Sequence, residues 1–433
     1  MTAPAATPTG LVRAVSRWQL VGMAINDVIG GGVFLLPATA AAMLGSASIW
    51  AVIVAGFAVS LLVLCFTEAS SHFDQPGGAY LYTREAFGHF VGFEVGWMTW
   101  LARVTTLASL PNGLVQAAAY FSPSVRYGWR RATIICAMIV LLAWINRRGV
   151  RAGARTSVAL VIAKMVPLIF FIVVGAWFID GSRLVVHEMP RGSALAQAAL
   201  LLIFAYGGFE NTPAAAGEFR NPRRDVPFAL LVTIFCVTLI YSSVQAVALG
   251  TLPQLATSSS PLAEAAAIFS GHRAATLISV GAMLSIIGLS SNVTLSGPRY
   301  LLALSTDGYG PRWLARLHPV YHTPANAILL QTVVVLALAL SGSFVLLATL
   351  SVIARIATYI GTAAAVPILR RRMGFRPDAV RLPLGATIPI AALTLAVTLL
   401  ASATRKQLLL AAAALIAGSC VFALRRPVAA APT

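Results

Sequence analysis

Two clusters of glycine interrupt otherwise apolar stretches of the chain, at residues 26–34 and 204–210, and each cluster contains an acidic residue. Glycine is less favourable than alanine inside a helix by about 1 kcal/mol, so adjacent glycines predict a local break. In lipid a broken helix is tolerated only where it lines a cavity or is packed by protein. The freed N–H and C=O groups suit the charged ends of a small ligand, although close helix packing is an alternative explanation. The glycines are Gly30, Gly31, Gly32, Gly207 and Gly208.

Charged side chains within apolar stretches are the second group of residues that could do chemistry. An ionisable group inside a membrane span is a functional-site hypothesis by default. Lys164 could bind and release a proton, or it could be a permanently charged strut between helices. Asp27 and Glu210 could each neutralise Arg103, because buried charges are generally paired, or Arg103 could instead select an acidic ligand. Two further charges carry no specific signal and are interpreted as packed or paired: Glu94 and Arg355.

The sequence offers no catalytic or metal-binding set. The four cysteines lie inside apolar runs without the spacing of a metal site or a disulfide framework. No Ser/His/Asp set is visible, and the paired glycines lack the lysine of a phosphate-binding loop. We therefore expect no enzyme activity, no cofactor and no metal.

The composition indicates a membrane protein. Hydrophobic residues make up 58% of the 433-residue chain and charged residues only 10%, against roughly 25% charged residues in soluble proteins. The net charge of +18 is scattered between apolar runs rather than gathered on a basic helix, so we expect no nucleic-acid partner. Twelve spans of about 20 residues are expected, at about 18–45, 47–70, 88–121, 129–146, 153–179, 194–219, 227–251, 274–304, 325–341, 343–369, 384–402 and 406–424.

The distribution of Lys and Arg between these spans predicts the orientation. Twenty of the 31 basic residues fall in segments on the N-terminal side of the membrane, and eight fall in segments on the opposite side. Cytoplasmic loops carry the excess of positive charge, so both termini are expected in the cytoplasm. Residues 1–17 are predicted to be a disordered cytoplasmic N-terminal tail, and residues 425–433 a cytoplasmic C-terminal tail. We therefore expect a multi-pass protein of the cell (inner) membrane, with membrane lipid as one partner. The excess of arginine over lysine suggests a bacterial source.

The two glycine clusters occupy matching positions, since Gly207 follows Gly30 by 177 residues and each lies in the first span of a five-span block. Glycine-interrupted spans at corresponding positions of two halves point to a transporter binding site. Five is an odd number, so the second block must be inverted in the membrane. The prediction is an all-α membrane protein in which residues 18–180 and 193–369 form an inverted five-plus-five repeat, followed by helices 11 and 12 in residues 384–424.

An ordered set of motifs resembles the amino acid–polyamine–organocation (APC) superfamily of permeases. IGGGVFLLP at residues 29–37 is similar to the family's first-helix signature I-G-S-G-I/V-F-x-L-P. QPGGAY…REAFG at residues 75–88 is similar to P-x-x-G-G-x-Y…R-E-A-F-G, and GFE…GEFRNPRRDVP at residues 208–227 is similar to G-F-E…E-x-x-N-P-x-R-x-x-P. GPRY…DG at residues 297–308 and TP at residues 323–324 complete a match that covers nearly the whole chain.

The resemblance implies the leucine-transporter fold, with discontinuous helices 1 and 6, and carriage of a free amino acid or a relative. The N–H groups at the new helix start after the first break suit the substrate α-carboxylate. Carbonyl groups at both breaks suit the α-ammonium. By family position, Phe204 resembles an aromatic gate over the substrate, with ordinary packing as the alternative. The implied substrate-binding residues are Val28, Gly30, Gly31, Gly32, Val33, Phe204, Gly207 and Gly208.

The resemblance also implies the mode of coupling. In family members with a lysine at the position of Lys164, the ammonium stands where sodium sits in sodium-coupled relatives. Ser290 and Ser291 on the eighth span are expected near it. Sodium coupling is therefore disfavoured, and coupling to protons or to a counter-substrate is expected.

Three other charged residues are interpreted as coupling or gating residues. Glu210 matches a family acid that affects gating, and Arg103 falls at a family position facing the side-chain end of the substrate. Asp27 departs from the family, which usually has a neutral residue there. The expected substrates are a small neutral amino acid first, then an acidic one read by Arg103, then a cationic one or a polyamine.

The sequence therefore predicts a secondary amino-acid permease that works by alternating access. The alternative is a membrane sensor or assembly subunit that keeps the transporter fold without flux. The motifs do not separate import, export and exchange, and they do not distinguish a monomer from a homodimer.

Overall fold

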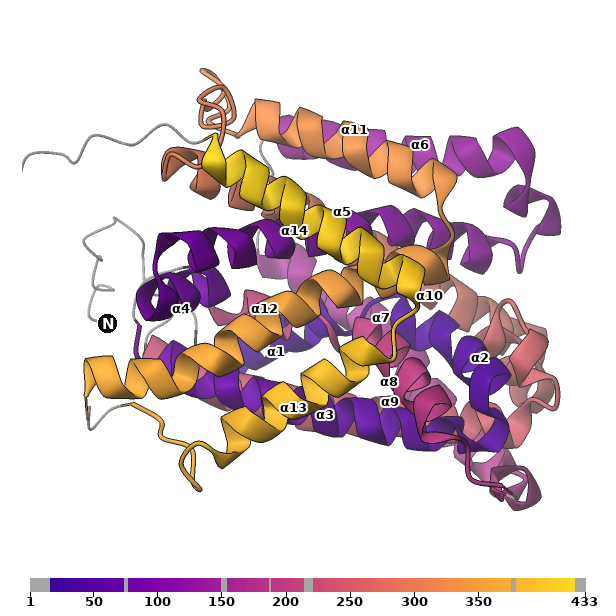
Figure 1. Cartoon of the computed structure of the whole chain (residues 1–433). Helices are drawn as coiled ribbons and strands as arrows, with labels where there is room; N and C mark the ends of the chain where they lie inside the picture. The colour runs from indigo at the N-terminus through magenta and orange to yellow at the C-terminus, as the bar shows by residue number, and fades with distance from the viewer. Residues whose placement is uncertain are drawn as a thin grey trace, which may run out of the picture.

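The protein, here as a computed structural model, is described over residues 16–73, 77–148, 154–186, 188–213, 221–374 and 379–424. Within these ranges it consists of helices and connecting loops, without a strand (Figure 1). Most of the predicted N-terminal tail and all of the C-terminal tail lie outside the described residues, as do residues 214–220 of the third motif. The α-helices are α1 (Arg17–Val28), α2 (Gly32–Leu44), α3 (Ser48–Ser71), α4 (Gly78–Phe87), α5 (His89–Ala118), α6 (Gly128–Arg148), α7 (Ala154–Gly175), α8 (Gly192–Tyr206), α9 (Pro222–Thr251), α10 (Pro261–Thr306), α11 (Ala325–Ser341), α12 (Phe344–Met373), α13 (Thr387–Ala401) and α14 (Arg405–Ala423).

Several of these helices have the length and composition of membrane spans. Six helical segments of the described chain qualify by both criteria, and four shorter apolar helices accompany them. Large apolar side chains such as Phe235 and Leu239 on α9, and Leu329 and Val333 on α11, are exposed on the surface of the molecule. A surface of this kind is suited to lipid. The protein is an all-helical, multi-pass membrane protein, and the count of twelve spans remains a prediction.

The first glycine cluster separates α1 from α2. α1 ends at Val28, and Ile29 has extended torsion angles (φ −74°, ψ 101°), so the chain leaves the helix there. Its N–H still reaches back to the carbonyl of Ile25 at 2.9 Å, which closes the last turn. α2 begins at Gly32, so the interruption falls on the residues that the sequence predicts.

The second glycine cluster ends α8 at Tyr206. Gly207 is extended (φ −70°, ψ 141°), and Gly208 has φ +133°, a conformation that is accessible essentially only to glycine. A short 3-10 turn, η5 (Phe209–Asn211), follows. The change of direction between α8 and η5 therefore depends on the glycine at position 208.

The two breaks lie against each other. A side chain at Gly208 would overlap the backbone oxygen of Asp27, and a β-carbon at Gly32 would lie 3.0 Å from the Cα of Ala205. Glycine at both positions allows this close approach of two backbones. The ends of four helical segments (α1, α2, α8 and η5) therefore meet in one place inside the bundle.

The helices α5 and α12 run beside this meeting point and are joined by polar pairs. Thr99 and Thr358 place their hydroxyl oxygens 3.0 Å apart, and those of Thr106 and Ser351 lie 2.6 Å apart. In Figure 1, α6 and α11 lie side by side at one edge of the molecule, and α14 crosses α5 and α12. The pair α5–α12 is thus a buried wall beside the two breaks.

Candidate functional site

Lys164 of α7 binds the end of α1. Its Nζ donates hydrogen bonds to the carbonyl oxygens of Asn26 at 2.6 Å and Ile29 at 2.7 Å. Only 2% of the residue is exposed. The C-terminal carbonyls of a helix carry partial negative charge and lack intrahelical donors, so a cation here is favourable. Lys164 therefore fixes the first break from one side.

A side chain of α10 binds the same end of α1. The Asn292 amide donates a hydrogen bond to the Asp27 carboxylate. Ser290 is buried and donates to the carbonyl of Ile286 at 2.7 Å, whereas Ser291 is exposed. The expectation that Ser291 lies at Lys164 is wrong, because the 100° rotation per helical residue turns Ser291 outward and presents Asn292 to α1. The placement of Ser290 near Lys164 stays a prediction.

Glu210 is the centre of a buried ionic network at the second break. Its Oε1 accepts from Nη1 of Arg355 and lies 3.5 Å from Nη2 of Arg103. Its Oε2 accepts from the N–H of Gly208 at 2.9 Å and lies 3.4 Å from the hydroxyl of Tyr359. One carboxylate thereby joins η5 to α5 and α12.

The sequence left open whether Asp27 or Glu210 neutralises Arg103. In the structure Arg103 forms a buried ion pair with Glu210. Its Nη2 also donates to the side-chain oxygen of Asn211. The guanidinium lies 6.0 Å from the centre of the Tyr300 ring, within the range of a cation–π contact.

The predicted carboxylate site, the N–H groups of residues 31–33, and the preceding Gly30 lie closely packed against α10. A β-carbon on Gly31 would lie 2.7 Å from Cγ1 of Ile286, and one on Gly30 would overlap Cδ2 of Leu289. The first N–H groups of α2 have no preceding helical turn to accept their hydrogen bonds. These backbone donors lie at the start of α2, next to α10.

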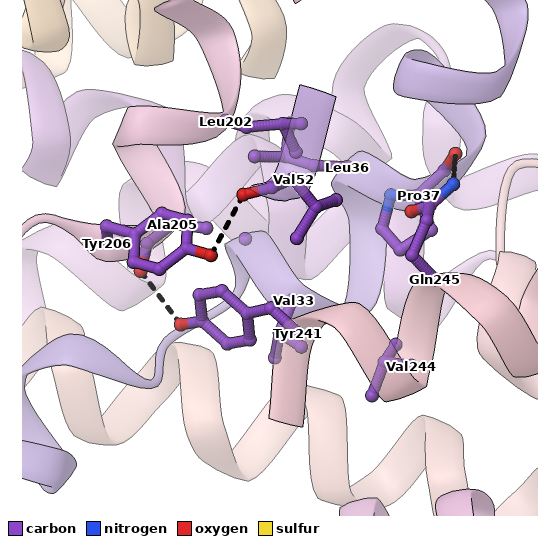
Figure 2. Close-up of a pocket in the computed structure, with 11 residues that line it drawn as sticks. Val33, Leu36, Pro37, Val52, Leu202, Ala205, Tyr206, Tyr241, Val244 and Gln245 are labelled. Atoms are coloured by element: carbon purple, nitrogen blue, oxygen red, sulfur yellow. Dashed lines mark hydrogen bonds between the residues drawn. The ribbon is translucent and has the colours of Figure 1, made fainter. Parts of the chain in front are cut away.

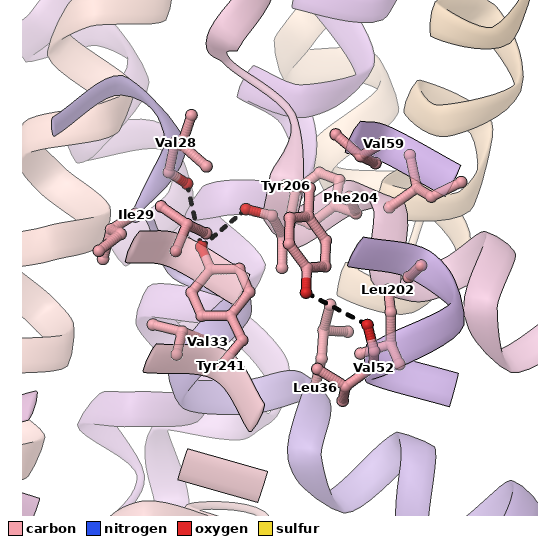
Figure 3. Close-up of a cluster of buried hydrophobic side chains, with 14 of the residues drawn as sticks. Val28, Ile29, Val33, Leu36, Val52, Val59, Leu202, Phe204, Tyr206 and Tyr241 are labelled. Atoms are coloured by element: carbon pink, nitrogen blue, oxygen red, sulfur yellow. Dashed lines mark hydrogen bonds between the residues drawn. The ribbon is translucent and has the colours of Figure 1, made fainter. Parts of the chain in front are cut away.

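The carbonyl groups predicted for the ammonium have a tyrosine beside them. The hydroxyl of Tyr241 on α9 lies 3.3 Å from the carbonyl oxygen of Val28 and 2.8 Å from that of Ala205. Figure 3 shows this hydroxyl between the two broken helices. Tyr206 donates in turn to the carbonyl of Val52 at 3.2 Å. A hydroxyl that bridges both breaks holds them together.

A small cavity adjoins the breaks. It has a volume of about 20 Å³ and is lined by α2, α3, α8 and α9, including Val33, Ala205 and Tyr241 (Figure 2). A volume of this size holds about one water molecule. The breaks are therefore closely packed by their own side chains, and this cavity has no room for an amino acid.

Phe204 lies on the last turn of α8 and packs edge-on against Phe344 of α12, with ring centres 5.7 Å apart. This contact places an aromatic pair between the second break and the start of α12. It fits both the gate and the packing interpretation of Phe204. Among the described residues, no group of three or more His, Cys, Asp and Glu side chains could hold a metal ion.

Sequence reasoning missed several residues of this site. The interpretation of Arg355 as packed or paired holds, but the sequence does not name its partner, which is Glu210. The charge of Arg355 within an apolar span was the available signal. Asn292, Asn211 and Tyr241 are uncharged and gave none, because only the packing of helices shows which polar side chains reach the breaks.

The chain belongs to the amino acid permease family, since the family model described as amino acid permease matches residues 15–417. The methylthioribose transporter of Bacillus subtilis is 28% identical over 400 residues, covering 88% of this chain and 86% of that protein. The serine/threonine exchanger of Bacillus subtilis is 28% identical over 402 residues, covering 89% of each chain. The branched-chain amino acid permease of the same organism is 26% identical over 401 residues, covering 88% and 85%. The protein is accordingly an APC-superfamily membrane transporter and not an enzyme.

Proposed function

We propose that this permease is a secondary transporter that moves amino acids across a bacterial cell membrane by alternating access. The observation that carries the proposal is the contact between the two helix breaks, where Gly208 packs on the backbone of Asp27 and Gly32 packs on Ala205. Discontinuous helices that meet near the middle of the membrane are the usual binding place of such transporters. Two of the relatives are named for amino acids, serine/threonine and branched-chain.

The substrate binds at the breaks in this proposal. Its α-carboxylate takes the N–H groups of residues 31–33, where a helix N-terminus favours an anion. Its α-ammonium takes the carbonyl of Val28 and those of residues 207–208. Support comes from the position of Tyr241, whose hydroxyl now lies beside the Val28 carbonyl and would give way to the ammonium.

Coupling is independent of sodium in this proposal and uses protons or a counter-substrate. The ammonium of Lys164 bonds the carbonyls of Asn26 and Ile29, which a sodium ion at this place would need as ligands. Hard cations such as sodium and calcium are bound through oxygen atoms of this kind. The rest of the proposed architecture follows the family: an inverted five-plus-five repeat, two further helices and both termini in the cytoplasm.

Uptake into proteoliposomes tests the coupling. Labelled amino acids are added with sodium or with choline as the external cation, under an imposed pH gradient or with unlabelled amino acid inside. We expect equal uptake in sodium and choline, and stimulation by the pH gradient or by internal amino acid. Uptake that requires sodium would contradict the role given to Lys164. Binding without flux would instead support the sensor alternative.

A further inference from the structure

The charged side chains around the breaks do not cancel in their ordinary protonation states. Three buried cations, Lys164, Arg103 and Arg355, face two anions, the buried Glu210 and the partly buried Asp27. An uncompensated charge inside a membrane protein is costly, so a net charge of one sign there calls for a ligand of the opposite sign. The hydrogen bonds show which of the three cations has donors free for such a ligand.

All three nitrogens of the Arg355 guanidinium are hydrogen-bonded within the protein. Its Nε donates to Ser351 at 3.3 Å, its Nη1 to Glu210, and its Nη2 to Thr106 at 3.0 Å. Ser351 and Thr106 belong to the polar contact between α5 and α12. Each nitrogen of this guanidinium therefore has a partner that also holds the two helices together.

Both carboxylate oxygens of Glu210 are likewise occupied by partners within the protein. Its two oxygens have four neighbours, two on each oxygen: Arg355 and Arg103 at Oε1, and Gly208 and Tyr359 at Oε2. A carboxylate offers about four lone-pair positions, so this one has no capacity left. Neither Arg355 nor Glu210 therefore has a position left for a further ligand.

Arg103 differs from Arg355. Within the part of the chain that the structure describes, only its Nη2 has polar partners, which are Asn211 and the already saturated Glu210. Its Nε and Nη1 make no hydrogen bond there, although only 1% of the residue is exposed. A guanidinium has five N–H donors in a planar fork that matches a carboxylate. Arg103 shares the charge of Glu210 with Arg355 and lies within electrostatic range of Asp27, so the excess positive charge belongs to the cluster as a whole. Arg103 is the member of the cluster in which most of the fork is open.

The position of Arg103 along α5 places it within reach of a ligand at the first break. Leu110, seven residues further on, is the α5 side chain nearest to Gly31, at 3.8 Å from a β-carbon built there. Seven helical residues correspond to about 10 Å along the axis. The side chain of an arginine and that of a bound amino acid, extended toward each other, bridge such a distance.

We propose that the substrates are amino acids with a second carboxylate, and that Arg103 is the specificity-determining residue that binds it. This inference rests on the proposed function. A zwitterionic amino acid adds no net charge and leaves the excess positive charge of the cluster uncompensated, and a cationic amino acid adds to the excess. An acidic amino acid compensates it and fills the open fork with a bidentate, charge-assisted contact.

Competition in wild-type proteoliposomes tests the inference without any variant. Aspartate, glutamate, asparagine and glutamine are compared as inhibitors of the uptake of whichever labelled amino acid is transported. The acids and their amides have nearly the same shape, so the comparison isolates the charge. We expect the acids to inhibit at concentrations roughly tenfold or more below those of the amides, a ratio equal to about 1.4 kcal/mol.

The Arg103→Gln variant then assigns the preference to its residue. It should lose roughly tenfold or more in apparent affinity for the acids with little change for the amides, and Arg103→Lys should recover part of the loss. Arg183→Gln is the matched control, because Arg183 is half-exposed in a loop outside the site. If Arg103→Gln fails to fold, the comparison of acids with amides in the wild-type protein still tests the preference for a second carboxylate.

The outcomes separate this inference from the proposed function. Transport of amides with no inhibition by acids would overturn the inference and leave the proposed function intact. Uptake of neutral amino acids that requires chloride would also overturn it, because a small anion would then fill the place given to the second carboxylate. No flux of any amino acid would count against both, since the inference depends on a transported substrate.

Discussion

The ammonium of Lys164 holds the carbonyl oxygens of Asn26 and Ile29 at the end of α1. Lys164→Ala removes both donors and leaves buried carbonyls without partners, at a cost of about 1–3 kcal/mol each. In the proton-coupled form of the proposal, the variant loses accumulation driven by a pH gradient more than it loses substrate binding. Uptake and equilibrium binding are measured on the same preparation, with Lys164→Met as a neutral variant of similar length. Full accumulation in both variants would show that the lysine is only a strut.

The pair between Glu210 and Arg355 predicts strong non-additivity between two substitutions. Arg355→Met should lower the free energy of unfolding by about 3–5 kcal/mol, because it removes the main partner of a buried carboxylate. Glu210→Gln is also destabilising, since it leaves two arginines without an anion. The double variant should lose clearly less than the two single losses together, because neither charge is then left alone. Thermal unfolding in detergent measures all three variants against the wild type, and additive losses would argue against the pair.

At the scale of the helix, glycine at the first break provides a direct prediction. Gly31→Leu should abolish substrate binding, because its β-carbon would lie 2.7 Å from Cγ1 of Ile286 and the rest of the side chain would fill the carboxylate site. Gly22→Ala in α1 is the matched control: a β-carbon there has no heavy atom within 4 Å, and alanine favours the helix by about 1 kcal/mol. Equilibrium binding of labelled amino acid compares the two. Unchanged affinity in Gly31→Leu would exclude the break as the carboxylate site.

The sequence allowed prediction of features that depend on one segment alone. The interruptions at residues 29–31 and at Gly207–Gly208 follow from local glycine content, and the burial of Lys164 follows from its place in an apolar run. The partner of Arg355 was not predictable, because Glu210 is 145 residues away and reaches α12 only through the turn after Gly208. The outward direction of Ser291 likewise depends on how α10 is rotated against α1. Helix rotation and register are set by packing between distant segments, which periodicity does not reveal in helices that are apolar on all sides.

At the scale of the whole molecule, two polar contacts close the end of the bundle that is predicted to face the cytoplasm. The Glu68 carboxylate of α3 binds Arg370 of α12 through two nitrogens, with Nη2 at 2.6 Å. Tyr80 of α4 donates to Asp307, which follows α10, at 2.5 Å. Burial and the adjacent Asp307 carboxylate raise the pKa of Tyr80 above its ordinary value, so its hydroxyl keeps its proton and remains a donor at physiological pH. If the protein works by the proposed alternating access, we predict that these contacts break when the site opens to this side.

Weakening the contact between Glu68 and Arg370 should therefore increase opening on this side. Cys65, one turn before Glu68 on α3, is fully buried and reports the change. In a protein with the other three cysteines replaced by serine, Glu68→Gln should raise the rate of Cys65 labelling by a maleimide several-fold, since removing a charged partner weakens a hydrogen-bonded pair. Glu85→Gln, a change to an exposed carboxylate near Arg84, is the control. Equal labelling rates in the two variants would show that the pair does not control opening.

Flux of amino acids across a membrane tests the central claim most directly. Purified protein and its Gly31→Leu variant are reconstituted in parallel, and uptake of a panel of labelled amino acids is followed over time. The account predicts saturable uptake by the wild type, enhanced by a pH gradient or by internal amino acid, and no uptake by the variant. Saturable binding by the wild type with no flux under any of these conditions would contradict the claim, and would identify the protein as a sensor that keeps the transporter fold.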